Sequence, residues 1–84
     1  MSNLQKLYAW NNCGIGDYGI RDLNLIELYA NNNENITKLN HMTNLRILDA
    51  SGECGIDEEG ICNLKLIKLF KYGNKNLKKI ILHQ

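Results

Sequence analysis

Apolar side chains return along the chain in one pattern that occurs four times. The unit reads LxxLxAxxN, and its copies follow one another at spacings of 21, 20 and 21 residues. The second leucine and the alanine are two positions apart, so on a β-strand both point to one face. The pattern therefore predicts four short parallel strands. The copies divide a single domain, residues 1–84, into repeats of about 4–24, 25–44, 45–65 and 66–84.

Apolar residues between the predicted strands lie at spacings near three, as at Ile36, Leu39 and Met42. This spacing predicts 3₁₀ or short helical turns and argues against long helices. A second, longer period is also present, because a shift of 41 residues pairs Cys13-Gly14-Ile15 with the identical Cys54-Gly55-Ile56 and Gly19-Ile20 with Gly60-Ile61. The sequence thus predicts an α/β fold built from repeats.

The repeated unit resembles the leucine-rich-repeat family, whose repeats carry LxxLxLxxN in 20–29 residues. Its short period is similar to internalin-like members, and residues 36–42 and 43–52 also look like repeat proteins of large amoebal viruses. The resemblance implies a solenoid of about four coils, with a parallel β-sheet on the concave face and short 3₁₀, helical or irregular convex segments. The chain departs from the family where alanine or Lys71 replaces the third leucine, and where Glu53 replaces the asparagine.

The asparagine of each unit is predicted to satisfy backbone groups where the chain turns away from the strand. Its amide both donates and accepts hydrogen bonds, whereas the ionised carboxylate of Glu53 only accepts. The third repeat is therefore expected to have a weaker link there, or a side chain turned to solvent.

The C-terminal segment has two interpretations. As a repeat, Asn74, Leu77 and Ile80 match Asn33, Ile36 and Leu39; as a strand, residues 77–82 also fit LxxLxL and would fold back as an antiparallel hairpin. Either way, apolar surface is expected near the end of the chain. The residues that carry it are Ile80, Ile81 and Leu82.

Five of the six aromatic residues lie at strand positions predicted to face away from the core. The curved sheet face of repeat proteins is the usual recognition surface, and Tyr and Trp give contact energy at low entropic cost. The alternative is that these rings stack on one another for stability alone. We expect a protein–protein interaction module that binds a protein partner through this face, with Tyr8, Tyr29, Asp49 and Phe70 in a single ladder. The expected binding residues are Tyr8, Trp10, Tyr29, Asn31, Asp49, Phe70 and Tyr72.

Neither end of the repeat array shows a polar capping repeat, since the first strand begins at Leu4. An open coil exposes core residues and an unpaired strand edge. The alternative function is therefore a self-assembling structural repeat protein, a homo-oligomer joined through its ends, including Ile80, Ile81 and Leu82, or through its aromatic face.

Composition narrows the function classes further. A net charge of +1 and a pI near 7.7 give no field that would recruit nucleic acid or an anionic membrane. No apolar run approaches the ~20 residues that span a bilayer. Three cysteines without CxxC spacing fit reduced thiols, and the expected location is cytoplasmic, in the host cytoplasm if the protein is viral.

Candidate chemistry is sparse. Residues 14–19 spell GxGxxG, but the equivalent segment from Gly55 carries carboxylates where a phosphate would sit. Cys13 and Cys54 are expected to be buried, and about 10 Å apart if strands stack at about 4.8 Å, which is too far for a disulfide. His41 and His83 have no acid or nucleophile at a fixed spacing. We therefore expect no enzyme, no catalytic residues, no metal and no cofactor.

Overall fold

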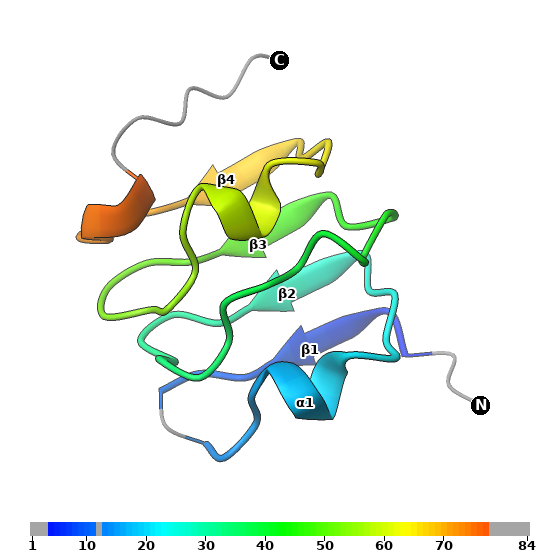
Figure 1. The fold of residues 1–84 in the computed structure, drawn as a ribbon, viewed down its shortest axis with the longest axis horizontal. Coiled ribbons are helices and arrows are strands. Elements are labelled where there is room, and N and C mark those ends of the chain that lie inside the picture. The colour runs from blue at the N-terminus through cyan, green and yellow to red at the C-terminus, as the bar shows by residue number, and fades with distance from the viewer. Residues whose placement is uncertain (1–3, 12, 78–84) are drawn as a thin grey trace.

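Four three-residue strands form the framework of the protein in a computed structural model that describes residues 4–11 and 13–77. They are β1 (Lys6–Tyr8), β2 (Glu27–Tyr29), β3 (Ile47–Asp49) and β4 (Lys68–Phe70). All neighbours are parallel, and the sheet order follows the chain, β1-β2-β3-β4 (Figure 1). Each strand is centred on the second leucine of one sequence unit. The predicted α/β class with four parallel strands is confirmed.

Helix is short and scarce in the described residues. The segments are α1 (Asp17–Ile20) and the 3₁₀ turns η1 (Glu59–Ile61) and η2 (Lys75–Leu77). In Figure 1, α1 and the yellow turn η1 both lie on the near side of the sheet. They occupy equivalent places in the first and third repeats, as the 41-residue period predicts.

The core lies between the sheet and these connecting segments. The central strand leucines are in register, so that Leu7, Leu28, Leu48 and Leu69 form one row. Leucine side chains of the two inner strands are fully buried, because they have a strand on either side and the connecting segments over them. The remaining fully buried apolar residues are Ala9, Ile20, Leu25, Ala30, Ile36, Leu39, Met42, Leu45, Ala50, Ile56 and Leu77.

Buried asparagines tie each even-numbered repeat to the one before it. Asn33 Nδ2 donates to the carbonyl oxygens of Ala9 and Ile15, both at 2.9 Å, while its Oδ1 accepts from the backbone N–H of Asn35. Asn74 repeats this arrangement towards the third repeat. The side chain of Glu53, in the same place in the third repeat, is exposed. The amide thus acts as expected from its ability both to donate and to accept.

The fourth repeat follows the second as far as the structure describes it. Leu77 is buried within the 3₁₀ turn η2, as Ile36 is buried at the equivalent place, and no strand begins at Leu77. Residues 78–84 lie outside the described part of the chain. The proposed self-association residues, Ile80, Ile81 and Leu82, therefore lie outside it as well.

The cysteines are free thiols, but one expectation about them is wrong. Cys54 is buried and Cys13 is exposed, although the two occupy the same position of the repeat. The difference arises because Cys54 is covered by the preceding repeat, whereas Cys13 belongs to the first repeat. Burial raises the pKa of the Cys54 thiol, since a thiolate would lose hydration there.

Candidate functional site

The side chains of the four strands that point away from the core form what we call the outer sheet face. Strand register places Tyr8, Tyr29, Asp49 and Phe70 in one row across it. A second row, at the start of the strands, contains Lys6, Glu27, Ile47 and Lys68. The residues predicted to form a ladder are thus in register.

Three aromatic rings at the β1 end of this face pack into one unit, the aromatic cluster. Tyr8 and Tyr29 stack with ring centroids 4.8 Å apart and planes 13° from parallel. Trp10 meets Tyr8 edge-on at 5.3 Å and 73°. Both geometries are favourable for aromatic pairs. Tyr8 is still 53% exposed and Trp10 49% exposed, so the cluster presents ring surface to solvent.

Polar contacts hold the cluster in one orientation. The Tyr29 hydroxyl donates to Glu27 Oε1 at 2.7 Å, and the Lys6 ammonium lies 3.7 Å from the same oxygen. The hydrogen bond to Glu27, with partial desolvation, raises the pKa of Tyr29 to about 12. The phenol therefore stays protonated well into the alkaline range, and its hydroxyl is held by Glu27.

Asp49 interrupts the aromatic row. Its Oδ1 accepts from the backbone N–H of Ser51 at 3.1 Å, which turns the carboxylate towards its own strand end. Phe70 lies two strands from Tyr29, about 10 Å away at normal strand spacing. Phe70 is half-buried, whereas Tyr72 is 78% exposed. The row of four residues therefore carries its aromatic rings in two groups, at opposite ends of the sheet.

Asn31, another predicted binding residue, is half-buried just beyond the end of β2. Its backbone carbonyl accepts from the N–H of Asn11 at 2.8 Å, which continues the sheet beyond β1 and β2. Its side-chain oxygen is buried and has no hydrogen-bond partner within the described residues. That oxygen is not offered to a ligand on the surface.

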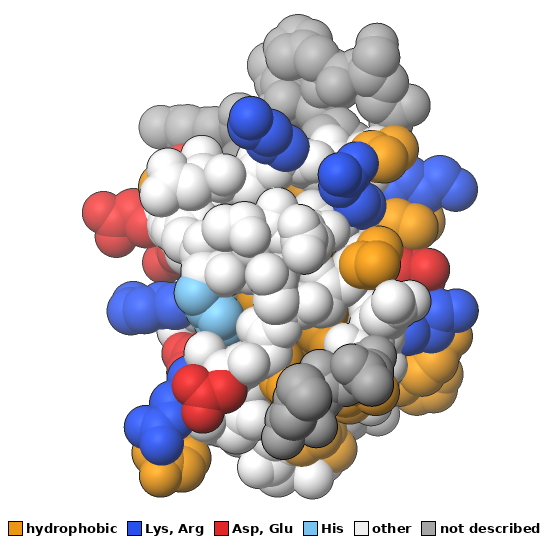
Figure 2. All heavy atoms as spheres, turned by 90° about the vertical axis from the view of Figure 1, so that its right-hand side faces the viewer, with side chains coloured by type: hydrophobic (Ala, Val, Ile, Leu, Met, Phe, Trp, Pro, Cys, Tyr) orange, Lys and Arg blue, Asp and Glu red, His pale blue; other side chains and the backbone are white. Residues whose placement is uncertain are grey.

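Apolar residues at the start of the strands were not among the predicted site residues. Leu4, Ile26 and Ile67 are all large and exposed. The side of the molecule from which the strands start faces the viewer in Figure 2, where hydrophobic side chains gather towards the right with Lys and Arg between them. Two of them could have been found from the sequence, because Ile26 and Ile67 directly follow the first leucine of the second and fourth units.

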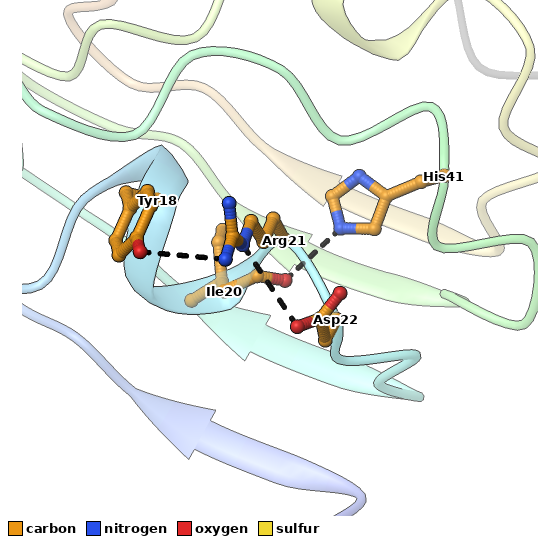
Figure 3. A network of polar contacts seen from close by, with 5 residues as sticks. All are labelled: Tyr18, Ile20, Arg21, Asp22 and His41. Carbon is orange, nitrogen blue, oxygen red and sulfur yellow. Dashed lines mark hydrogen bonds and ion pairs between the residues drawn. The ribbon is translucent and has the colours of Figure 1, made fainter.

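The connecting segments, on the side of the sheet opposite the outer sheet face, carry polar contacts of a different kind. Arg21 stacks 4.1 Å over the Tyr18 ring, reaches its hydroxyl at 3.3 Å and pairs with Asp22 at 3.8 Å, while His41 Nε2 lies 3.0 Å from the carbonyl oxygen of Ile20 (Figure 3). The His41 contact joins α1 to the second repeat, whereas the contacts of Arg21 lie within the first repeat. They leave no acid, base and nucleophile arranged around a shared point.

The GxGxxG segment has a structural explanation. The helix that follows it, α1, has four residues, too few to direct a row of amides at a phosphate. Asp17 accepts from the backbone N–H groups of Thr37 and Lys38 and from the Thr37 hydroxyl. Burial alone would raise the pKa of Asp17, but these bonds outweigh burial and lower it. The segment thus links the first repeat to the second.

The described residues contain neither a metal-binding cluster nor a membrane-spanning helix. They include no group of three or more His, Cys, Asp or Glu side chains placed to hold a metal ion. None of their helices has the length and apolar character needed to cross a membrane. Comparisons with protein-family models, curated proteins and solved structures gave no significant match.

Proposed function

We propose that the chain is a leucine-rich-repeat solenoid that acts as a protein–protein interaction module and binds its partner through the outer sheet face. Two observations support the solenoid. The LxxLxAxxN unit recurs four times, and each copy contributes one strand to a single parallel sheet. Repeats of this kind bury a continuous core by stacking, and they leave one face of the sheet open.

The aromatic cluster is the observation that carries the binding proposal. Tyr8, Trp10 and Tyr29 combine exposed ring area with fixed geometry, since they pack on one another and Tyr29 is bonded to Glu27. Energetically dominant interface residues are enriched in Trp and Tyr. A surface that is already ordered also loses less conformational entropy on binding.

The charges of the face favour a protein over a polyanion. Lys6 is paired with Glu27, and the remaining strand charges are Asp49 and Lys68, one of each sign. A nucleic-acid surface needs a field of one sign, which these residues do not provide. The proposal includes a cytoplasmic location, supported by three free cysteines, and assigns no catalytic step and no cofactor.

A displayed library of random peptides, selected on the immobilised wild-type chain, tests the face directly. Selected peptides are expected to lose binding to Tyr8→Ser/Trp10→Ser by at least about tenfold, because loss of each aromatic anchor typically costs over about 1 kcal/mol. Circular dichroism would verify that the variant keeps the fold.

Tyr18→Ser is the matched control. Tyr18 is exposed like Tyr8, but it lies on α1 away from the outer sheet face. Peptides that bind this control and fail on the double variant support the proposal. Peptides that bind wild type and both variants equally would refute it.

A further inference from the structure

The first repeat exposes residues that its counterpart in the third repeat buries. Leu4 is 45% exposed, whereas Leu45, 41 positions later, is 1% exposed. Cys13 is exposed and Ile15 partly so, whereas Cys54 and Ile56 are buried. In the third repeat these residues are covered by the second repeat. The first repeat therefore presents the same kind of surface with nothing from the described residues stacked on it.

Gly19 gives a second, independent indication. At the equivalent Gly60, an added Cβ would lie far inside van der Waals contact with the carbonyl oxygen of Thr37, so only glycine fits. At Gly19, an added Cβ would meet just the Ile15 side chain, at 3.8 Å. The contacts within the described residues do not require glycine there. A repeat stacked on the first, as the second is stacked on the third, would require it.

We propose that the chain self-associates head to tail, with the fourth repeat of one copy stacked on the first repeat of a second copy. The 41-residue period makes the fourth repeat the counterpart of the second, and the first that of the third. For the described part of the fourth repeat, residues 66–77, the new junction thus corresponds in position to the existing one between repeats two and three. That junction is held by backbone bonds such as Ala30 N–H to Asp49 O at 2.8 Å and Gly55 N–H to Asn33 O at 3.2 Å.

The distribution of aromatic rings fits this arrangement. Transfer of the β2–β3 register to β4 and β1 places Phe70 of one copy opposite Tyr8 of the other. The same register brings Tyr72 of the first copy beside Trp10 of the second. The two ring groups that Asp49 separates within one chain would then form a single cluster across the junction. Among the described residues, the outer edges of β1 and β4 carry no further strand.

Two lysines oppose the association. The same register places Lys68 opposite Lys6 of the next copy, and like charges directly across a strand pair are destabilising. Lys71 occupies the position of Ala30, and its ammonium donates to the carbonyl oxygen of Leu77 at 3.0 Å. Inward-pointing charges weaken strand-edge pairing. The junction is therefore reversible, and it strengthens with salt because salt screens Lys6 from Lys68.

Sedimentation velocity across a concentration series in reducing buffer tests the proposal. The wild-type chain is expected to form oligomers that increase with concentration and with salt. The emission of Trp10, the single tryptophan, should shift to the blue as they form. Lys68→Glu should tighten association by about two- to twentyfold and reverse its salt dependence, since it places opposite charges across the junction. Lys38→Glu, a charge reversal in the second repeat away from the junction, should change neither property.

Two loss variants test the polarity of the junction. Gly19→Ala blocks the β1 side, and Phe70→Ser/Tyr72→Ser removes the rings of the β4 side; each should be largely monomeric alone. Mixed together, they retain one intact junction and should form a dimer that does not grow further.

The proposal is overturned if the wild-type chain is monomeric throughout, or if Phe70→Ser/Tyr72→Ser still forms a dimer as a symmetric β1–β1 contact would. It does not depend on partner binding. Gly19→Ala leaves the outer sheet face intact, so this variant should still bind the selected peptides when it no longer self-associates. The two proposals can therefore be refuted independently.

Discussion

At the residue scale, Glu27 organises the outer sheet face. Its carboxylate accepts a hydrogen bond from the Tyr29 hydroxyl at 2.7 Å and lies 3.7 Å from the Lys6 ammonium. The bond requires a protonated phenol, which is why the pKa of Tyr29 is raised to about 12 from an ordinary value of 10.0. The stabilisation it gives is complete below about pH 10 and is lost as pH rises towards about 12.

Glu27→Gln should remove this shift. An amide oxygen is a weaker acceptor than a carboxylate and carries no charge to oppose phenolate formation. In an alkaline titration followed by phenolate absorbance, the wild-type chain should show one of its four tyrosines ionising near pH 12, and the variant should lose this late step. Glu53→Gln, which changes an exposed carboxylate away from Tyr29, should keep it. A late step that persists in Glu27→Gln would assign the shift to another cause.

Single residues also show how far sequence reasoning reaches. The role of Asn33 and Asn74 followed from the ability of an amide to donate and accept, together with its fixed place after each strand. The buried oxygen of Asn31 did not, because its environment depends on packing between adjacent strand ends. Likewise, the direction of the Asp49 carboxylate depends on a bond to its own strand end, which the register alone does not reveal.

At the element scale, the connecting segments of adjacent repeats approach so closely that side-chain volume decides whether they fit. The N–H of Leu39 donates to the carbonyl oxygen of Gly60 at 2.8 Å, which brings the segment after β2 against η1. Asp17 makes the corresponding link between α1 and Thr37. These contacts, rather than long helices, cover the core on the side opposite the outer sheet face.

Gly60→Ala should therefore destabilise the fold. Its Cβ would collide with the carbonyl oxygen of Thr37, a backbone atom that cannot turn aside as a side chain does. Overpacking of this kind costs about 1–3 kcal/mol, seen as a lower free energy of unfolding in urea. Gly19→Ala is the matched control, because an added methyl there meets just Ile15. Equal stability of the two variants would contradict the close approach.

At the scale of the whole molecule, the repeat period predicted the number of strands, their parallel pairing and the residues at their centres. It could not predict which copies of a repeated residue are covered. Leu4 and Leu45 have identical places in the unit, yet one is exposed and the other buried, because among the described residues a preceding repeat covers the third repeat and none covers the first. Burial in such a molecule depends on neighbouring repeats as well as on the sequence of each one.

Insertion of a second copy of residues 25–65 after Lys65 tests this description of the whole molecule. The insert places a copy of the second repeat directly after the third. By the 41-residue period, this new junction corresponds to the existing junctions between repeats one and two and between repeats three and four. If stability is a sum of repeat and junction terms, the longer chain should unfold at higher urea concentration. Its m-value should increase by roughly half, in proportion to the added surface. A control insert with aspartate in place of the leucines that copy Leu28 and Leu48 should lose both gains, since those side chains are fully buried. Unfolding of the duplicated chain at the wild-type midpoint with an unchanged m-value would show that the inserted repeats do not join the core.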